Sequence, residues 1–538
     1  MDDATQSVPP PDGGLTGAPR HAVRDDLPTS LLLGDILRAS ARVAGTRVAL
    51  IDGERRMSYA EFDATCDRLA AALVTAGFGK GDRIAAMMMN RSEYALLFFA
   101  AARAGVVLCH LSTRTTPRDI AHSLGKVGAR ALFIQQEMLA QFEEARSMGA
   151  SCERVIVIGG ARAEVQDFIE RATTVPMPHL TADDLLGVNF TGGTTGSPKA
   201  VAVTHGARAA NVIGGMADFR IDARDVCIVA TPMFHTVGLY VWFGTVIAVG
   251  ATALLQPNWQ PRRFLDVAEH HGASATLLVP TQLIDLLGTP EFLPTRLAAM
   301  RTMHHAGAPM AGAVLDRLEA TLPWVKFIDH YGQSETGQIT LRAPEFNRSK
   351  RESVGRPVAG IEARIVDRDG TPQPPGLVGE LVTRGPHLLQ RYWNDPEQTA
   401  AAFRYGDGWL ATGDLGRCDD DGFITLVDRA KDMIVSGAEN IYPMELENAL
   451  YRHPDVRECA VFGIPDARWG EVPAAHVVLR AGATVDKLAL IAHVERETIR
   501  WKRPRVIEFV ESLPKTAIGK IQKNLLREPY WRHLKRRI

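Results

Sequence analysis

The sequence predicts an α/β protein: a large N-terminal part built from stacked sheets with helices on their faces, and a smaller C-terminal α+β part. Two observations lead to this prediction. From residue 58 onward, segments with helical spacing alternate with short apolar segments, which is typical of strands covered by helices on both faces. From residue 361 the pattern changes to short strands separated by turns, and after residue 429 helices and strands mix again.

Individual elements follow from their residues. Residues 59–76 have helical spacing and stop before Gly77, and residues 92–105 form a second helical segment that ends in a glycine. The expected strands of the first part are residues 82–89, 106–112, 129–134, 153–159, 225–231 and 250–257. The β-rich subdomain is expected to hold strands in residues 362–370, 379–385, 407–414 and 421–429, and the C-terminal part a helix in 444–454 and strands in 458–464 and 474–480. We therefore expect a tail over residues 1–27, an N-terminal domain over 28–430 and a C-terminal domain over 431–538.

Composition excludes several classes of protein. With 538 residues, 46% of them hydrophobic and 23% charged, the chain has the make-up of a globular protein with more than one domain. Its net charge of −1 gives no general attraction to nucleic acid or to an anionic membrane. The six cysteines are far apart and form no C-x-x-C pair, which favours reduced thiols in a cytoplasmic protein over a disulfide framework or a zinc site.

Two segments require a check for targeting or membrane insertion. Residues 1–27 are rich in proline and glycine and lack a basic segment followed by an apolar one, so we expect a disordered tail rather than a secretory signal. Residues 236–260 carry no charge over more than the ~20 residues that span a bilayer. Three glycines interrupt this segment and ATALL near its end favours a strand, so we expect a buried helix followed by a core strand and no membrane span.

The segment FTGGTTGSPKA, residues 190–200, is suited to binding phosphate. Backbone N–H groups and hydroxyls in a glycine-rich loop can donate to phosphate oxygens, and a lysine adds positive charge. It is not a Walker loop, because Ser197 and Pro198 separate Gly196 from Lys199. Taken alone, the segment could also be a surface turn.

Further motifs follow in a fixed order. They are PMFHTVGL (232–239), HHAGAPM (304–310), DHYGQSETG (329–337), GWLATGD (408–414), DRAKDMIVSGAENIYPMELE (428–447) and PKTAIGKIQK (514–523). Together with the glycine-rich loop, and over residues 30 to 530, this order resembles the adenylate-forming superfamily of acyl- and aryl-CoA ligases, luciferases and peptide-synthetase adenylation domains. The chain departs from the family pattern at Gly192, where serine is usual, and at Ala200, where glycine is usual; the lost hydroxyl predicts weaker ATP binding.

The resemblance implies an ATP site and a two-domain fold with a mobile C-terminal domain. Glu335 would hold Mg²⁺, a hard ion that prefers oxygen ligands, although Ser334–Glu335 taken alone could be a helix cap. Asp414 and Arg429 would bind the ribose, although a buried structural salt bridge is the alternative for this pair. The β- and γ-phosphates would be held by Thr191, Gly193, Thr194, Thr195, Gly196 and Lys199, and the adenine by Gly307, Ala308, Pro309, Asp329 and Tyr331. Ser334, where threonine is usual, keeps the hydroxyl and is also expected in the ATP site.

The resemblance places two lysines in special roles. Lys520 matches the catalytic lysine that bridges the carboxylate and the α-phosphate. Lys431 falls at the hinge about which the C-terminal domain rotates after adenylation. From the residues alone, each could be an ordinary solvated lysine.

The second half-reaction needs a thiol, and RWGE (468–471) and WKRPR (501–505) resemble the coenzyme A contacts of aryl-CoA ligases. Trp469 and Trp501 could stack on adenine, Arg503 and Arg505 could pair with phosphates, and Ser436 and Gly437 would flank the pantetheine tunnel. An ordinary basic surface is the alternative. No carrier-protein domain follows in this sequence.

The acid is expected to lack an α-amino group, because His235 stands where amino-acid-activating relatives place an aspartate. Val237, Gly214 and Gly332 are expected beside the acid, in a mostly apolar pocket where Gly214 and Gly215 leave room. His305 and His330 could add polarity or be satisfied core histidines.

The function predicted from the sequence is an ATP-dependent ligase that converts an apolar carboxylic acid, fatty or aromatic, to its CoA thioester through an acyl-AMP, with ATP, Mg²⁺ and coenzyme A as cofactors and co-substrates. The alternative is an adenylating enzyme that loads a separate carrier protein. A luciferase-like oxygenase and a catalytically silent acyl-nucleotide sensor share the motifs, while a Walker-type NTPase fails on the loop spacing. A homodimer is an open expectation, and no nucleic-acid partner is expected.

Overall fold

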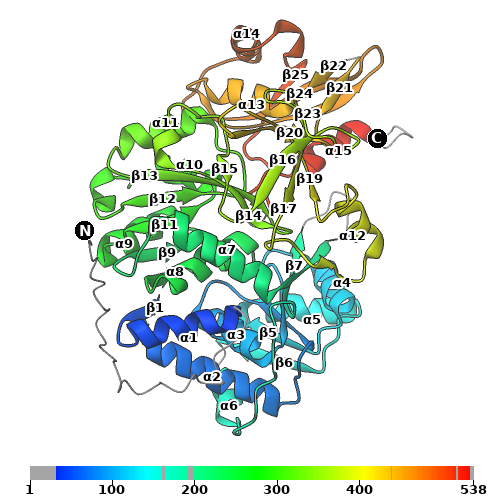
Figure 1. Ribbon diagram of the computed structural model, residues 1–538. Helices are drawn as coiled ribbons and strands as arrows, with labels where there is room; N and C mark the ends of the chain where they lie inside the picture. Colours follow the sequence, from blue (N-terminus) through cyan, green and yellow to red (C-terminus); the bar gives the residue numbers. More distant parts are fainter. Residues whose placement is uncertain (1–31, 160–163, 192–197, 438, 517–518, 533–538) are drawn as a thin grey trace, which may run out of the picture.

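The computed structural model describes residues 32–159, 164–191, 198–437, 439–516 and 519–532, and arranges them in four sheets (Figure 1). Apart from β18 (Arg391–Tyr392), two large sheets come from the first two thirds of the chain. A four-stranded sheet follows, and the elements after residue 430 gather at one end of the molecule. The predicted disordered tail, residues 1–27, lies outside the described residues.

The first large sheet has nine strands in the order β15-β14-β13-β12-β11-β9-β10-β1-β2. Its six central strands are parallel, and β2, β14 and β15 are added antiparallel at the edges. The strands are β1 (Val48–Asp52), β2 (Arg55–Ser58), β9 (Val226–Val229), β10 (Thr252–Leu255), β11 (Ala275–Leu278), β12 (Thr302–His305), β13 (Lys326–Gln333), β14 (Gly337–Arg342) and β15 (Arg356–Pro357).

The second large sheet has seven strands in the order β18-β8-β7-β4-β3-β5-β6. Strands β7, β4, β3, β5 and β6 are parallel, whereas β8 and β18 run antiparallel to their neighbours. The strands are β3 (Arg83–Met87), β4 (Val107–His110), β5 (Ala131–Gln135), β6 (Arg154–Ile158), β7 (Leu185–Thr191), β8 (Lys199–Thr204) and β18 (Arg391–Tyr392). In open parallel sheets the carboxyl ends of the strands form the usual ligand site, and the glycine-rich loop follows β7.

Two smaller sheets complete the molecule. The β-rich subdomain is an antiparallel sheet of β16 (Glu362–Val366), β17 (Gly379–Arg384), β19 (Leu410–Cys418) and β20 (Ile424–Arg429). The C-terminal sheet contains β21 (Ile434–Ser436), β22 (Glu439–Ile441), β23 (Val456–Asp466), β24 (Gly470–Leu479) and β25 (Val506–Phe509). All strands expected from the sequence are present, so the predicted fold class is confirmed.

The helices cover the sheets and begin and end where the sequence provides caps. At the start of α2 the Ser58 side chain accepts from the Glu61 amide and the Glu61 carboxylate accepts in return. Helix α3 ends at Gly105, whose φ of 66° is left-handed. The helices of the N-terminal part are α1 (Leu33–Ala44), α2 (Tyr59–Thr75), α3 (Ser92–Ala104), α4 (Pro117–Val127), α5 (Leu139–Ser147), α6 (Glu164–Glu170), α7 (His205–Asp218), α8 (Gly244–Ala248), α9 (Pro261–His271), α10 (Pro280–Leu287), α11 (Gly312–Thr321) and α12 (Pro396–Ala402). The C-terminal helices are α13 (Pro443–Tyr451), α14 (Lys487–Glu497) and α15 (Lys523–Trp531); short turns are η1 (Gln136–Met138), η3 (Pro294–Leu297), η4 (Pro344–Phe346) and η5 (Arg500–Lys502).

The largest hydrophobic core lies between the two large sheets. Helix α3 contacts β4 of one sheet and β1 of the other, and is buried along nearly its whole length. Phe98 and Phe99 of this helix pack against Tyr240 and Phe243. These two rings belong to η2 (Val237–Phe243), a π-helical segment.

The uncharged segment 236–260 forms η2, α8 and then β10, as predicted. No helix in the described part of the chain is long and apolar enough to cross a membrane. The six cysteines are all free, in agreement with the absence of a disulfide framework.

Candidate active site

Strands β7 and β8 hold the two ends of the glycine-rich loop. Thr191 and Lys199 face each other across this antiparallel pair. The ammonium group of Lys199 lies 5.1 Å from the centre of the Tyr392 ring, on β18. The predicted phosphate-binding residues Gly193, Thr194, Thr195 and Gly196 lie outside the described residues.

Tyr392 also connects this strand edge to Glu335. Its hydroxyl donates to Glu335 Oε1 at 2.8 Å, and burial together with the charge of Glu335 raises its pKa. Tyr392 therefore contacts both Lys199, which is predicted to bind the phosphates, and Glu335, which is predicted to hold Mg²⁺. The sequence did not predict this tyrosine. A single carboxylate beside a lysine predicted to bind phosphate suits Mg²⁺, which is commonly held by one or two carboxylates plus substrate phosphates.

The predicted ribose residues form a compact group. Asp414 Oδ2 accepts from the Tyr331 hydroxyl at 2.6 Å and from Gln333 Nε2 at 2.7 Å, and Asp414 Oδ1 lies 3.1 Å from Arg429 Nε. Burial and the neighbouring Asp414 raise the pKa of Tyr331 well above its ordinary value, so this hydroxyl remains a donor. Gln333 was not predicted, although it lies within the DHYGQSETG motif.

Asp329 lies in a buried polar group rather than at the surface of a cleft. Its Oδ1 is 3.1 Å from His305 Nδ1 and its Oδ2 is 3.3 Å from Arg342 Nη2. Burial alone would raise its pKa, but His305 and Arg342 hold the pKa of this carboxyl below its ordinary value. The adenine contact predicted for Asp329 stays a prediction. His330 is a core histidine whose Nε2 is 2.7 Å from His304 Nδ1.

Backbone geometry explains two of the predicted glycines. Gly307, which follows β12 and precedes Ala308 and Pro309, has a φ of 85° in the left-handed region. A Cβ on Gly332 would collide with the carbonyl of Gly337, because β13 and β14 approach closely at a register shift. Both positions therefore need glycine, while their roles beside adenine and acid stay predictions.

Lys520 reaches this group from the far end of the chain. Burial, and then the charge of Arg429, lower its pKa to about 8, with Asp414 acting in the opposite direction. In the same loop, the Thr516 amide donates a hydrogen bond to the Lys520 carbonyl at 2.8 Å. A Cβ on Gly519 would collide with the Thr281 hydroxyl of α10, so this loop packs directly on the N-terminal part.

Lys431 lies two residues after Arg429, between the β-rich sheet and the C-terminal sheet. Its side chain is exposed, and its carbonyl accepts from Arg527 Nη1 at 3.3 Å. The position between two sheets agrees with a hinge, and the hinge role stays a prediction.

Part of the predicted coenzyme A set comes together. The Gly437 amide donates to the Trp469 carbonyl at 2.6 Å, and Ser436 pairs with Gly470. Trp469 is 42% exposed, which is unusual for a residue of this size. Asp466 accepts from the Trp469 amide at 2.9 Å, and the charge of Arg505 is one of the causes that lower the pKa of Asp466.

The rest of that set is less clearly grouped. Trp501 lies on η5 and is 39% exposed. Arg503 is already engaged in an ion pair with Glu495 of α14.

The acid side is only partly open. His235 Nε2 has no hydrogen-bond partner among the described residues, and burial lowers the pKa of His235 to about 4. A Cβ on Gly214 would meet only Val358, at 3.9 Å, so there is room at this position of α7. Helix α7 also contacts η2, which begins at Val237. The expectation that Gly215 also leaves room is wrong, because a Cβ there would collide with the Thr245 side chain.

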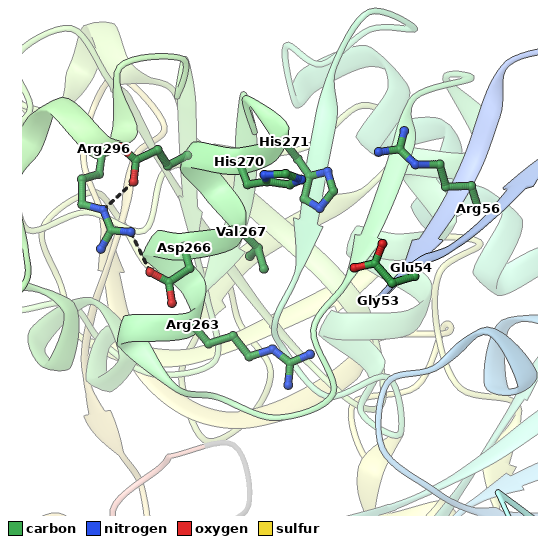
Figure 2. Close-up of a pocket in the computed structure, with 10 residues that line it drawn as sticks. Gly53, Glu54, Arg56, Arg263, Asp266, Val267, His270, His271 and Arg296 are labelled. Atoms are coloured by element: carbon green, nitrogen blue, oxygen red, sulfur yellow. Dashed lines mark hydrogen bonds and ion pairs between the residues drawn. The ribbon is translucent and has the colours of Figure 1, made fainter.

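A surface hollow of about 690 Å³ lies elsewhere, between the β1–β2 turn and α9 (Figure 2). Arg296 on its rim bonds to Asp266 and Glu269. None of the predicted site residues is among those that line it.

A model of the AMP-binding enzyme family matches residues 37–393, and a model of the AMP-binding enzyme C-terminal domain matches residues 445–520. The chain belongs to the AMP-binding enzyme family. Within this family it is an enzyme of the AMP-forming acyl- and aryl-CoA ligase branch, as predicted.

Individual relatives of this AMP-binding enzyme differ in the acid that their names give. Feruloyl-CoA synthase of an Amycolatopsis species is 32% identical over 91% of this chain and 97% of its own length. Long-chain-fatty-acid–CoA ligase FadD13 of Mycobacterium tuberculosis is 31% identical over 93% and 98%. The crystal structure of ATP-bound MatB from Rhodopseudomonas palustris superimposes with a TM-score of 0.86 at 29% identity, covering 94% of this chain and 100% of that one.

Proposed function

We propose that this AMP-binding enzyme converts an apolar carboxylic acid, fatty or aromatic, to its CoA thioester through an acyl-AMP, with release of pyrophosphate. The observation that supports this most directly is the position of Lys520. It comes from the C-terminal segment, yet the charges of Arg429 and Asp414 act on it, and the neighbouring Gly519 packs against Thr281 of the N-terminal part.

In the first half-reaction a carboxylate oxygen would attack the α-phosphorus of ATP, and the bond from this phosphorus to the bridging oxygen of pyrophosphate would break. Negative charge then spreads over the phosphates, so cations fixed in advance lower the barrier. Lys520 would contact the carboxylate and the α-phosphate, Lys199 the leaving pyrophosphate, and Asp414 the ribose. Glu335 would hold Mg²⁺, which when bound supplies charge neutralisation on the phosphates.

In the second half-reaction the sulfur of a thiol would lose its proton to solvent and attack the acyl carbon, and the bond from this carbon to the phosphate oxygen would break to release AMP. The exposed Trp469 beside Gly437 and the charge of Arg505 support coenzyme A as the acceptor. A carrier protein would not need a contact with the nucleotide part of coenzyme A.

The test is a panel of fatty and aromatic acids, assayed for pyrophosphate and AMP with and without coenzyme A. We expect multiple turnover only with ATP, Mg²⁺, an apolar acid and coenzyme A together. Release of ADP and orthophosphate would contradict the adenylate mechanism. Turnover with a carrier protein but not with coenzyme A would replace the acceptor and leave the first half-reaction intact.

A further inference from the structure

Arg208 of α7 is a charged side chain in the interior of the protein. It is fully buried, and among the described residues no carboxylate lies within ion-pair distance of its guanidinium group. Its Nη2 donates to the Ser334 carbonyl at 2.6 Å, its Nη1 donates to Asn211 Oδ1 at 2.9 Å, and it lies 5.1 Å from the centre of the Tyr240 ring. The sequence motifs give this arginine no role.

Asn211, one turn further along the same helix, contacts the same loop. Its Nδ2 donates to the Thr336 carbonyl at 3.2 Å. The Leu389 amide donates to the Glu335 carbonyl at 2.6 Å. The three consecutive carbonyls around the Glu335 side chain are thus each held by a different donor, two of them from α7.

The packing at the end of this turn is equally tight. Gly337 has a φ of 67°, and a Cβ there would collide with the Asn211 amide group. The turn from Gln333 to Gly337 therefore follows the surface of α7, and the direction of the Glu335 side chain depends on that contact.

The charge of Arg208 requires an explanation, because a buried guanidinium without a paired carboxylate is destabilising. Burial lowers its pKa, but only to about 10, so it stays charged near neutral pH. Glu335 is the carboxylate whose charge acts on Arg208. Burial, followed by other causes that include Arg208, lowers the pKa of both His110 and His387 to about 3, so these neighbours stay neutral.

We propose that Arg208 is a positioning residue for the metal-holding carboxylate: with Asn211 it fixes the backbone on both sides of Glu335, and so the direction of the Glu335 side chain. This inference rests on the role of Glu335 in the proposed function. It does not give Arg208 any contact with ATP or the acid. Partners of metal ligands commonly contribute about 10–100-fold to metal affinity.

The experiment compares Arg208→Met, which keeps the length of the side chain and removes its charge and donors, with Arg103→Met. Arg103 is also buried and pairs with Asp63 and Asp67 far from the site. Two readouts are measured against free Mg²⁺: the rate of acyl-AMP formation, and the rise in Tm that ATP produces. The rise in Tm can be measured without knowing which acid the enzyme uses.

For Arg208→Met we expect the half-saturating Mg²⁺ concentration to rise about 10–100-fold in both readouts. Thioester formation from pre-made acyl-AMP should change less than about threefold. Arg208→Lys should restore part of the response, because an ammonium keeps the charge and can donate to Ser334. Arg103→Met should lower the Tm without changing the Mg²⁺ dependence.

Parent-like Mg²⁺ dependence in Arg208→Met would overturn the inference, as would equal losses in both half-reactions. If Arg208→Met does not fold, Asn211→Ser decides: a several-fold rise in the half-saturating Mg²⁺ concentration supports the inference and no rise overturns it. Glu335→Gln separates the two proposals. If this variant keeps the parent Mg²⁺ dependence, the assigned role of Glu335 fails; if it loses the dependence while Arg208→Met keeps it, only the positioning inference fails.

Discussion

The two sides of the candidate site are held in very different ways. Asp414 accepts two hydrogen bonds and faces Arg429, and Glu335 is fixed by Tyr392 and by the donors of α7. Lys520, in contrast, is bonded through its backbone to Thr516 of its own turn, and no bond from its ammonium group to another described residue is seen. The acceptors are fixed within the N-terminal part, whereas the lysine is supplied by a separate segment.

This difference suggests how one site could serve two reactions. Acceptors that are fixed in advance need no reorganisation when charge develops on the phosphates. A lysine on a separate segment can be withdrawn when a different set of residues is needed. Burial and the positive charges of Arg429 and Lys431 lower the pKa of Lys520, against the negative charges of Asp414 and Asp432. We expect a bound polyanion to strengthen the docking of this lysine.

The largest expected effect tests the role of the supplied lysine. Lys520→Ala removes one positioned cation, and we expect acyl-AMP formation to slow by about 10²–10³-fold, the scale for one preorganised donor. Thioester formation from pre-made acyl-AMP should be nearly unchanged. Both rates are measured in single-turnover experiments, with the exposed Lys487→Ala on α14 as a matched control. Equal damage to both steps would show that Lys520 has a structural role.

The next prediction tests whether the lysine segment must move. The amides of Ala430 and Asp432 donate to Gly413 and Arg429, while no bond from the Lys431 amide to a described residue is seen. Proline at 431 would therefore remove no hydrogen bond, but it fixes φ near −65° and restricts Ala430. We expect Lys431→Pro to keep single-turnover acyl-AMP formation and to lose about 10²-fold in the thioester step, the scale of a small misplacement of reacting groups.

Lys431→Ala is the matched control, because it removes the same side chain and leaves φ free. Parallel losses in both half-reactions of the proline variant would contradict rotation about this residue.

The sequence predicted the parts of the site that lie within single motifs. Asp414, Arg429 and Glu335 each belong to a short motif that resembles the adenylate-forming superfamily, and the alternation of apolar segments predicted the sheets. Tyr392 was missed because its contact with Lys199 and Glu335 arises from the pairing of β18 with β8. The filling of space at Gly215 by Thr245 and the burial of Arg208 likewise depend on how α7 packs, which no local pattern encodes.

The low pKa of Lys520 leads to a smaller, pH-dependent effect. Burial lowers this pKa from 10.5 to about 8, so the ammonium form is present below pH 8 and is lost as the pH rises through that value. If the charged form is required, kcat/KM for acyl-AMP formation should fall tenfold per pH unit above about pH 8, because this parameter reports the free enzyme. Lys520→Arg should move this alkaline limb upward, since guanidinium stays charged. If the alkaline limb is unchanged in Lys520→Arg, it reports the titration of another group.

The smallest effect is expected at the boundary between the two parts, where Asp428 of β20 bonds to α13. Asp428 Oδ2 accepts from the Met444 amide at 3.0 Å and Oδ1 accepts from the Arg429 amide at 2.7 Å. Burial, and more weakly Glu447, raise its pKa to about 6, although Lys523 acts in the opposite direction. An unfolded aspartate has a pKa of about 3.9, so between these values the folded protein keeps a proton that the unfolded chain has lost.

Stability rises with pH only where the unfolded state binds more protons, so here the sign is reversed. The contribution of Asp428 to the free energy of unfolding should fall by about 2 kcal/mol from pH 4 to pH 7, at 1.36 kcal/mol for each pKa unit. Asp428→Asn keeps an acceptor for Met444 but cannot titrate. The free energy of unfolding of the parent minus that of Asp428→Asn, measured by urea denaturation from pH 4 to 7, should therefore decrease as the pH rises. A constant difference would mean that the pKa of Asp428 is the same in the folded and unfolded states, and a rising difference that folding lowers it. A falling difference would show that ionisation of Asp428 weakens the junction between β20 and α13 as the pH rises towards neutral.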